Sequence, residues 1–338
     1  MKNNNSRILW IDYAKGIGIF LVIVGHFWYF SKYPVVNKLI YSFHMPMFFM
    51  LSGFVYNIYK NISIGKYIKE KFIRILLPTI FYLILGVIKL YLTEMQSFKE
   101  LFRLFIFYDG KCPYNSPCWF FIVLFEIYII IYIFKYFLRN RYSSLAFSIL
   151  CLITGYIIYH GKIFIPFGID RAIIALGFFS VGAFIRHIYN YLKEKDKKTN
   201  IILLTMLFIV STTIWIVFVL KNGKVSLYLF SLHTYFYFII TGITGSIVLC
   251  IISYLASNIK HFREIATLSN NSIFIICTHY FIVYDLVNLF RDYHILYTKK
   301  FALFIPIFTL ILLMVYKPIC NYLDKHYPFL TGKQKEVI

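Results

Sequence analysis

The chain alternates long apolar runs with short polar connections. The apolar runs cover residues 8–30, 39–58, 74–93, 119–138, 145–160, 171–189, 201–220, 233–256, 271–291 and 301–320. Most of them have the roughly 20 residues that an α-helix needs to cross the hydrocarbon core of a bilayer, and the fifth run is the shortest. The pattern predicts an all-α fold, a polytopic membrane helical bundle with about ten transmembrane helices.

The composition agrees with this prediction. Hydrophobic residues make up 60% of the chain and charged residues only 14%, whereas a soluble domain needs more polar residues on its surface. The N-terminus is basic and then apolar, as in a signal peptide. However, Asp12 and Lys15 stand where the apolar region should begin and no small-residue cleavage site follows, so we interpret this run as a retained span. We expect residues 1–338 to form a single transmembrane domain with no appended soluble domain.

The positive charge is unevenly distributed along the chain. A net charge of +21 would suit a nucleic-acid-binding protein. With a cytoplasmic N-terminus, however, more than half of the 35 lysines and arginines fall in cytoplasmic connections. This bias is the positive-inside rule of membrane proteins. It predicts that both termini are cytoplasmic (N-in/C-in), and it argues against nucleic acid as a partner.

Three ionisable residues share one face of the first run. Lys15 precedes His26 by eleven residues, which is about three helical turns and roughly 16 Å along the axis. Asp12 lies one turn before Lys15. Ionisable groups are costly in lipid and normally face a protein interior or a water-filled cavity. The stripe therefore indicates a functional site, with His26 as the candidate catalytic residue.

The second run contains Phe43-His44-Met-Pro46-Met-Phe-Phe-Met-Leu-Ser52-Gly53. Pro46 removes a backbone donor, and Ser52-Gly53 permits close approach of another helix. A kinked, tightly packed helix is the simpler interpretation of Pro46 and Gly53. His44 is either a hydrogen-bonded structural histidine or a substrate contact.

Three further residues have both a structural and a functional interpretation. Arg74 opens the third run and is either an interfacial anchor or a ligand contact, because its planar fork suits phosphate and carboxylate. His279 lies inside the ninth run and is either structural or functional. Trp119, at the outer end of the fourth run, is most simply an interfacial aromatic. Cys112 and Cys118 could form a disulfide in a predicted outer loop, and without zinc-site spacing no metal is expected.

These motifs resemble, in order and spacing, those of the membrane acyltransferase-3 family, and within it those of the fucose 4-O-acetylase-like O-acetyltransferases. Each motif is weak alone, whereas their common order over nearly the whole chain is specific. Many family members carry arginine at the position of Lys15, so a bidentate phosphate contact would be lost here. The matching segments are Asp12-Tyr-Ala-Lys15-Gly-Ile, Gly25-His26, Phe43-His44-Met-Pro46-Met-Phe-Phe-Met-Leu-Ser52-Gly53, Arg74 with Pro78, Trp119-Phe, Ile165-Pro-Phe167, Ala175-Leu-Gly-Phe-Phe-Ser-Val-Gly182, and Leu268-Ser-Asn-Asn-Ser272 before His279.

The resemblance implies transfer of an acyl group, usually acetyl from cytoplasmic acetyl-CoA, to a hydroxyl of a carbohydrate acceptor. That acceptor is typically a cell-surface polysaccharide or its lipid-linked precursor, and a bacterial cytoplasmic membrane is the implied location. His26 is then a general base, or a transient acetyl carrier. Lys15, Arg74 and Asp12 are the candidates for binding acetyl-CoA at the inner face. The candidates for substrate binding are His44, Ser52, Trp119 and His279.

The leading alternative is a transporter or flippase for a sugar-lipid or a small solute, because ten helices and buried histidines also suit that class. The absence of an inverted repeat in the hydropathy pattern, together with the Lys15–His26 stripe, favours the enzyme. A glycan polymerase would carry a large arginine-rich outer loop, which the sequence lacks. The acceptor sugar, the length of the acyl group and any homo-oligomer have no recognisable motif.

Overall fold

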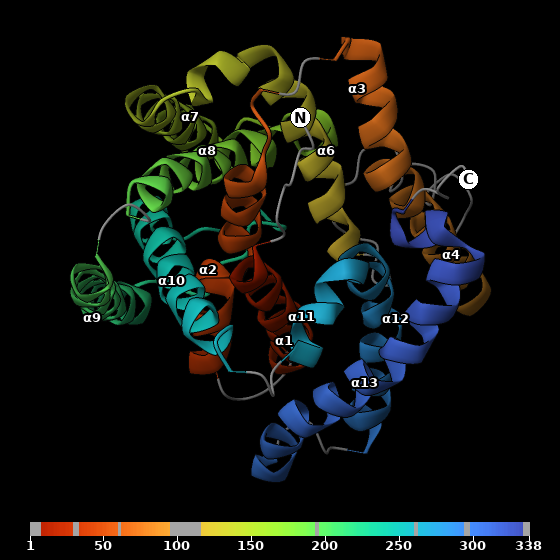
Figure 1. The fold of residues 1–338 in the computed structure, drawn as a ribbon. Helices are drawn as coiled ribbons and strands as arrows, with labels where there is room; N and C mark the ends of the chain where they lie inside the picture. The colour runs from red at the N-terminus through yellow and green to blue at the C-terminus, as the bar shows by residue number, and fades with distance from the viewer. Residues whose placement is uncertain are drawn as a thin grey trace.

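The computed structural model describes residues 8–29, 34–59, 62–94, 116–192, 196–259, 263–293 and 298–333. Within these ranges the regular structure is helical, apart from an isolated antiparallel bridge between Ser226 and Ser231. Figure 1 shows the arrangement of the helices. In chain order they are α1 (Leu9–Tyr29), α2 (Pro34–Val55), α3 (Ile64–Lys71), η1 (Phe72–Leu76), α4 (Leu77–Glu94), η2 (Ser116–Cys118), α6 (Trp119–Phe134), η3 (Lys135–Leu138), α7 (Arg141–His160), η4 (Pro166–Gly168), α8 (Ile169–Leu192), α9 (Lys197–Lys221), α10 (Tyr235–Ala256), α11 (Arg263–Leu268), η6 (Ser269–Asn271), α12 (Ser272–Asp292), α13 (Lys299–His326) and η8 (Pro328–Thr331).

The long helices have the properties of membrane spans. In the described part of the chain, nine helical stretches are long and apolar enough to cross a bilayer. α2 is also long enough, at 22 residues, but it is more polar because it carries Asn37, Ser42 and His44. The predicted polytopic helical bundle is confirmed, and the protein is a multi-pass membrane protein. Cys112 lies outside the described residues, and Cys118 is a free, buried cysteine in the structure, so the predicted disulfide is not seen.

Two predicted helix boundaries were wrong. The fifth run belongs to α7, which begins at Arg141 because the Asn140 side chain caps it, accepting a hydrogen bond from the Ser143 N–H at 2.9 Å. At 20 residues, α7 is long enough to span the bilayer. The polar connection predicted before residue 74 is largely helical, because α3 continues through the π-helical turn η1 into α4. Hydropathy missed α3 because it is lysine-rich, although it buries Tyr67.

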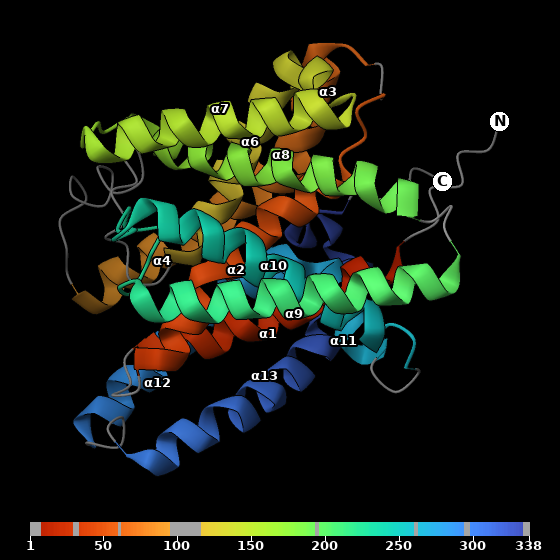
Figure 2. The same cartoon turned by 90° about the vertical axis from the view of Figure 1, so that its left-hand side faces the viewer.

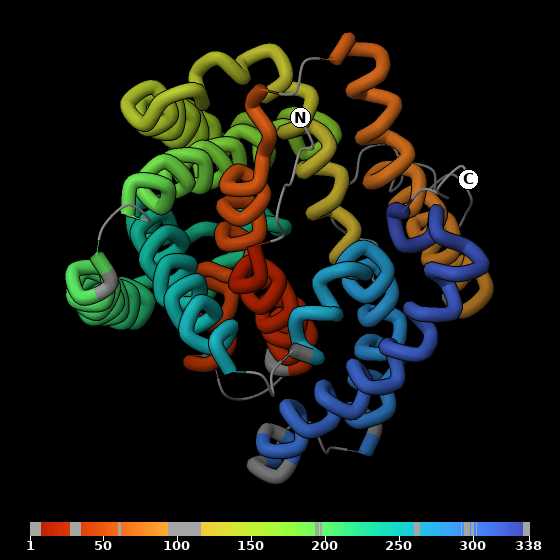
Figure 3. Tube along the Cα trace, in the orientation of Figure 1, coloured from red at the N-terminus to blue at the C-terminus, as the bar shows by residue number. Residues whose placement is uncertain are grey.

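The first two helices form the centre of the bundle. α1 contacts α2, α10, α11, α12 and α13. α2 crosses α8 very closely at two glycines: a Cβ on Gly53 would lie 1.8 Å from the Phe179 carbonyl oxygen, and one on Gly182 would lie 1.9 Å from that of Met50. The predicted close approach of another helix at Gly53 is therefore confirmed. α9 lies at the periphery (Figure 3), and only 6% of its most apolar stretch is buried, so most of its apolar surface is not covered by the rest of the chain.

The two ends of the bundle differ in what they bring together. Figure 2 shows most of the long helices running side by side, with α13 inclined to them. The starts of α1 and α12 meet, because the Ser269 hydroxyl donates a hydrogen bond to Asp12 Oδ1 at 3.0 Å. Following the predicted topology, we call the end where α1 begins the inner end and the opposite end the outer end. His26 lies three residues before the last residue of α1, and therefore near the outer end.

Candidate active site

Histidine and tyrosine rings from two helices, α12 and α2, surround His26 of α1. On α12, the ring centroids of His279 and Tyr280 lie 5.2 and 4.8 Å from that of His26. On α2, the Tyr41 hydroxyl oxygen lies 3.3 Å from His26 Nδ1, and the Tyr41 ring centroid is 4.9 Å from that of His44. Three histidines and two tyrosines, far apart in sequence, therefore form one cluster.

Hydrogen bonds to backbone carbonyls determine the tautomers of two of these histidines. Nδ1 of His44 lies 2.8 Å from the Ile40 carbonyl oxygen, and Nδ1 of His279 lies 3.0 Å from that of Ile275. A carbonyl oxygen can only accept, so each neutral imidazole carries its proton on Nδ1 and keeps Nε2 as an acceptor. Nε2 of His279 is buried and has no hydrogen-bond partner among the described residues. His279 therefore has an unused acceptor beside His26.

His26 faces a cavity of about 210 Å³ rather than the lipid. Its walls come from α1, α2, the η2–α6 junction, the connection between α9 and α10, and α12. His44, Tyr41, Tyr280 and Trp119 also line it. His26 is partly exposed to this space, whereas His44 and Trp119 are almost fully buried. The cavity is thus a small, partly aromatic pocket with an imidazole on its wall.

A folded loop forms the outer wall of this cavity. The loop is the α9–α10 connection, and the Ser226–Ser231 bridge closes it. The guanidinium of Arg171, at the start of α8, donates from Nε to the carbonyl oxygen of Tyr228 at 2.9 Å. Arg171 in turn forms a buried ion pair with Asp170 at 3.0 Å. The loop residues that line the cavity are Ser226, Leu227, Tyr228 and Leu229.

The residues predicted to bind acetyl-CoA lie at the inner end. Asp12 is buried and accepts the hydrogen bond from Ser269, and Lys15 is half-buried one turn further along α1. Arg74 lies in η1 with its side chain 52% exposed, 3.9 Å from Glu70. About half of the Arg74 side chain is therefore accessible to a ligand at this end, beside its ion pair with Glu70.

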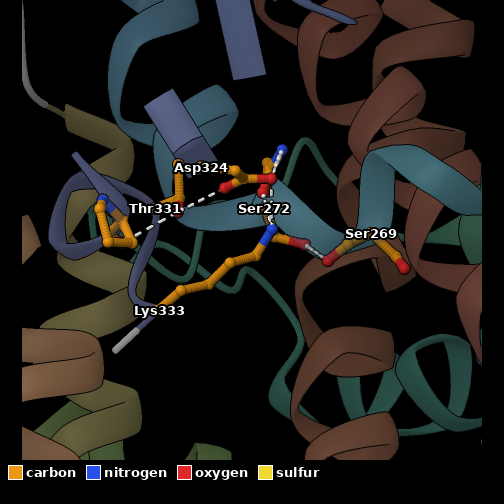
Figure 4. Close-up of polar contacts among 7 residues, drawn as sticks. Ser269, Ser272, Asp324, Thr331 and Lys333 are labelled. Atoms are coloured by element: carbon orange, nitrogen blue, oxygen red, sulfur yellow. Dashed lines mark hydrogen bonds and ion pairs between the residues drawn. The ribbon is translucent and has the colours of Figure 1, made fainter. Parts of the chain in front are cut away.

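A polar network fixes the start of α12 at this end (Figure 4). Lys333 donates to Asn271 Oδ1 at 2.8 Å and to Asp324 Oδ2 at 2.5 Å, and Asn271 Nδ2 donates to Asp324 Oδ2 at 3.2 Å. Thr331 adds a fourth bond, to Asp324 Oδ1, at 2.8 Å. Asn271 and Asp324 also line a second cavity, of about 190 Å³. The segment after α13 thus ties α13 to the turn that precedes α12.

The two cavities are separate. They share no lining residue, and Ile275, which lies between Asn271 of the second cavity and Ile276 of the first, is fully buried. A donor that enters at the inner end must therefore displace packed side chains to reach His26.

The structure brings some of the predicted site residues together and separates others. His44 and Trp119 share the cavity with His26, and His279 is in ring contact with it. Ser52 lies elsewhere: its hydroxyl donates to the Phe48 carbonyl oxygen at 2.8 Å, and it does not line either described cavity.

Sequence reasoning missed the two tyrosines that contact His26. The chain has 30 tyrosines, so the residue type alone carries little information. Tyr41 lies three residues before His44, a spacing that places both on one helix face, and this was the available signal. Tyr280 follows His279 directly and had no comparable pattern.

Residues 8–316 match a family model described as an acyltransferase domain. The nodulation protein NolL of Mesorhizobium japonicum is 36% identical to this chain over 89 residues, and the match covers 23% of each protein. The chain thus spans less than a quarter of the length of that relative. No solved structure matches the chain.

Proposed function

Because the chain belongs to the acyltransferase-3 family and is a membrane acyltransferase, we propose that it transfers an acetyl group from cytoplasmic acetyl-CoA to a sugar hydroxyl. We infer that the acceptor is a cell-surface glycan or its lipid-linked precursor and that the enzyme works in a bacterial cytoplasmic membrane. The observation that supports this most directly is that the His26 imidazole faces a cavity near the outer end. A base there meets an acceptor that approaches from outside.

The proposed chemistry needs one imidazole and a defined tautomer. With its proton on Nδ1, His26 donates to the hydroxyl oxygen of Tyr41, 3.3 Å away, and Nε2 is left to act as the base. Nε2 takes the proton of the sugar hydroxyl as the oxygen attacks the thioester carbonyl. The C–S bond then breaks, and the imidazolium returns the proton to the departing CoA thiolate. General-base catalysis of this kind contributes about 10²–10⁴-fold.

The donor is proposed to bind with its phosphates at the inner end. Lys15 and the exposed Arg74 supply positive charge there, and phosphate binding by such groups is favourable. Asp12, bonded to Ser269, is proposed to orient the start of α1. Lys15 and His26 are about 16 Å apart along the helix axis, a distance that the slender pantetheine arm has to span.

The test of His26 uses purified protein, labelled acetyl-CoA and the glycan of the host cell. We expect His26→Ala to lower the transfer rate by 10²-fold or more. The matched control is His326→Ala, because His326 is exposed at the end of α13 and its loss should leave the rate unchanged. Transfer by His26→Ala at the wild-type rate would remove His26 from the mechanism.

A second test addresses the donor site. We expect Lys15→Ala and Arg74→Ala each to raise the KM for acetyl-CoA, with Arg139→Ala as the control. Arg139 is also exposed, but its guanidinium packs over the Tyr136 ring at 4.2 Å. An unchanged KM for both test variants would show that neither side chain binds the donor.

A further inference from the structure

The cavity beside His26 has a composition that restricts what can enter it. None of the described residues that line it is Asp, Glu, Lys or Arg. The lining instead combines aromatic rings, among them Trp119, Tyr228 and Tyr280, with the hydroxyls of Ser116 and Ser226. Aromatic rings present apolar faces with a few polar edges. Such a surface suits a ring that carries hydroxyl groups on an apolar frame.

The size of the cavity sets a second restriction. At about 210 Å³, it is smaller than the roughly 300 Å³ at which sites for drug-sized ligands begin. It therefore has room for about one sugar ring, and the remainder of a longer glycan has to lie outside it.

The arginine behind the outer wall, Arg171, already has hydrogen-bond and ion-pair partners within the protein. Arg171 is buried, and its guanidinium bonds both Asp170, at 3.0 Å, and the carbonyl oxygen of Tyr228, at 2.9 Å. It also lies over the Phe230 ring, 5.6 Å from the centroid. These contacts use Arg171 to hold the loop, so it is not a counter-ion for a carboxylate in the cavity. An ionised carboxylate that enters without a partner loses its hydration and is strongly disfavoured.

We propose that this cavity accepts one uncharged sugar ring as the acetyl acceptor, and that Arg171 is a positioning residue that keeps the Tyr228 loop in place as its outer wall. This proposal rests on the acetyl transfer proposed above. It predicts selection against acidic sugars at the acetylation site, because no lysine or arginine in the described wall replaces the lost hydration while the histidines are neutral.

The test measures transfer from labelled acetyl-CoA by the full-length protein in liposomes to matched glycoside pairs. A methyl glucoside is compared with the methyl glucuronide, and a methyl galactoside with the methyl galacturonide. The members of each pair differ only in a hydroxymethyl group against a carboxylate, so only acetylation at O2, O3 or O4, which both members carry, is compared. We expect the neutral member of at least one pair to be acetylated, with kcat/KM at least tenfold above that of its acid. Equal or better transfer to the acids overturns the proposal, and so does a failure to acetylate any neutral ring.

The role of Arg171 is tested with Arg171→Lys, which keeps a positive charge for Asp170 but removes the Nε donor to Tyr228. We expect the KM for the neutral acceptor to rise at least fivefold while the KM for acetyl-CoA stays unchanged, since the donor binds at the other end. The control is Arg186→Lys on the same helix. Arg186 also donates to a backbone carbonyl oxygen, that of Tyr56 at 2.7 Å, but it lies at the opposite end of α8. Equal effects on both substrates, or equal effects of both variants, would make Arg171 merely structural.

These outcomes separate the two proposals. If acids are acetylated well and His26→Ala abolishes that transfer, only the selectivity is wrong. If His26→Ala transfers at the wild-type rate, the proposed function itself fails.

Discussion

The closest backbone contact between long helices gives a prediction with a calculable size. A Cβ on Gly53 would lie 1.8 Å from the Phe179 carbonyl oxygen, whereas a carbon and a carbonyl oxygen normally approach no closer than about 3.3 Å. Gly53→Ala therefore forces α2 and α8 apart by roughly 1.5 Å, because the opposing atom is backbone and cannot rotate away. Overpacking of this kind costs about 1–3 kcal/mol, and sometimes more. Gly182→Ala should cost a similar amount, since its Cβ would lie 1.9 Å from the Met50 carbonyl oxygen.

The assay is thermal unfolding of the purified variants in detergent, with the fraction of monodisperse protein as a second readout. Gly65→Ala is the control, because no atom lies within 4 Å of the added Cβ and alanine in a helix is favoured by about 1 kcal/mol over glycine. The double variant Gly53→Ala/Gly182→Ala should cost less than the sum of the two single changes, because helices that have already separated accommodate the second methyl group. If Gly53→Ala unfolds at the temperature of the wild type or above, or the two costs add fully, the helix crossing is wrongly described.

Three smaller perturbations test other contacts. Tyr41→Phe removes the hydroxyl that lies 3.3 Å from His26 Nδ1. Losing this hydrogen bond costs about 1 kcal/mol, which should lower kcat roughly fivefold with little change in KM. An unchanged kcat would contradict the proposed tautomer. Asp324→Asn should lower the unfolding temperature in the thermal assay, because Lys333, Thr331 and Asn271 all bond this carboxylate. The side chains of Asp324 and Lys333 are 26% and 39% exposed, so we expect the free energy of unfolding to fall by only about 1 kcal/mol. Lys89 Nζ lies 2.5 Å from the Asp285 carboxylate, so Asp285→Lys should lower stability by placing two cations side by side. Adding Lys89→Asp reverses the pair and should recover most of the lost stability, an outcome that a chance surface pair would not give.

The apolar pattern was sufficient to predict most of the fold. Hydrophobic runs of about 20 residues located the membrane helices because the bilayer leaves few other structures open to a spanning chain. α3 was missed because a lysine-rich helix contains no such run. α7 was predicted to be short because its first turn is polar, and its start depends on the Asn140 cap rather than on hydropathy.

Only part of the site could be predicted in the same way. His26 could be predicted because an ionisable group inside an apolar run is costly in lipid and is therefore a candidate functional residue. Tyr41 and Tyr280 become visible only when α2 and α12 pack on α1. Arg171 and Tyr228 are 57 positions apart, and their contact depends on a loop conformation that no periodicity encodes. Tertiary placement, not residue type, selects these side chains.

The glycines of α1 indicate the side along which the arm of the proposed acetyl-CoA donor would pass. A Cβ on Gly16 would lie 2.1 Å from the Ile265 carbonyl oxygen, so α1 is held against the backbone of α11. Gly18 instead faces the mobile ends of side chains on α2, with Met47 Cε 2.5 Å from its added Cβ. A methionine side chain can move aside more easily than backbone, so we expect the arm to enter between α1 and α2, where Phe48 lines the cavity.

Met47→Ala should therefore join the His26 cavity to the inner end, and acetyl-CoA hydrolysis without any acceptor should rise severalfold. The control is Met50→Ala, because both methionines are buried on α2 and both losses cost about 2–5 kcal/mol of stability. The Met50 backbone contacts α8 at Gly182, whereas the Met47 side chain contacts α1 at Gly18. A general loosening of the bundle would raise hydrolysis in both variants, whereas an increase confined to Met47→Ala locates the donor path between α1 and α2. Unchanged hydrolysis in Met47→Ala would mean that the arm reaches His26 along a different face of α1.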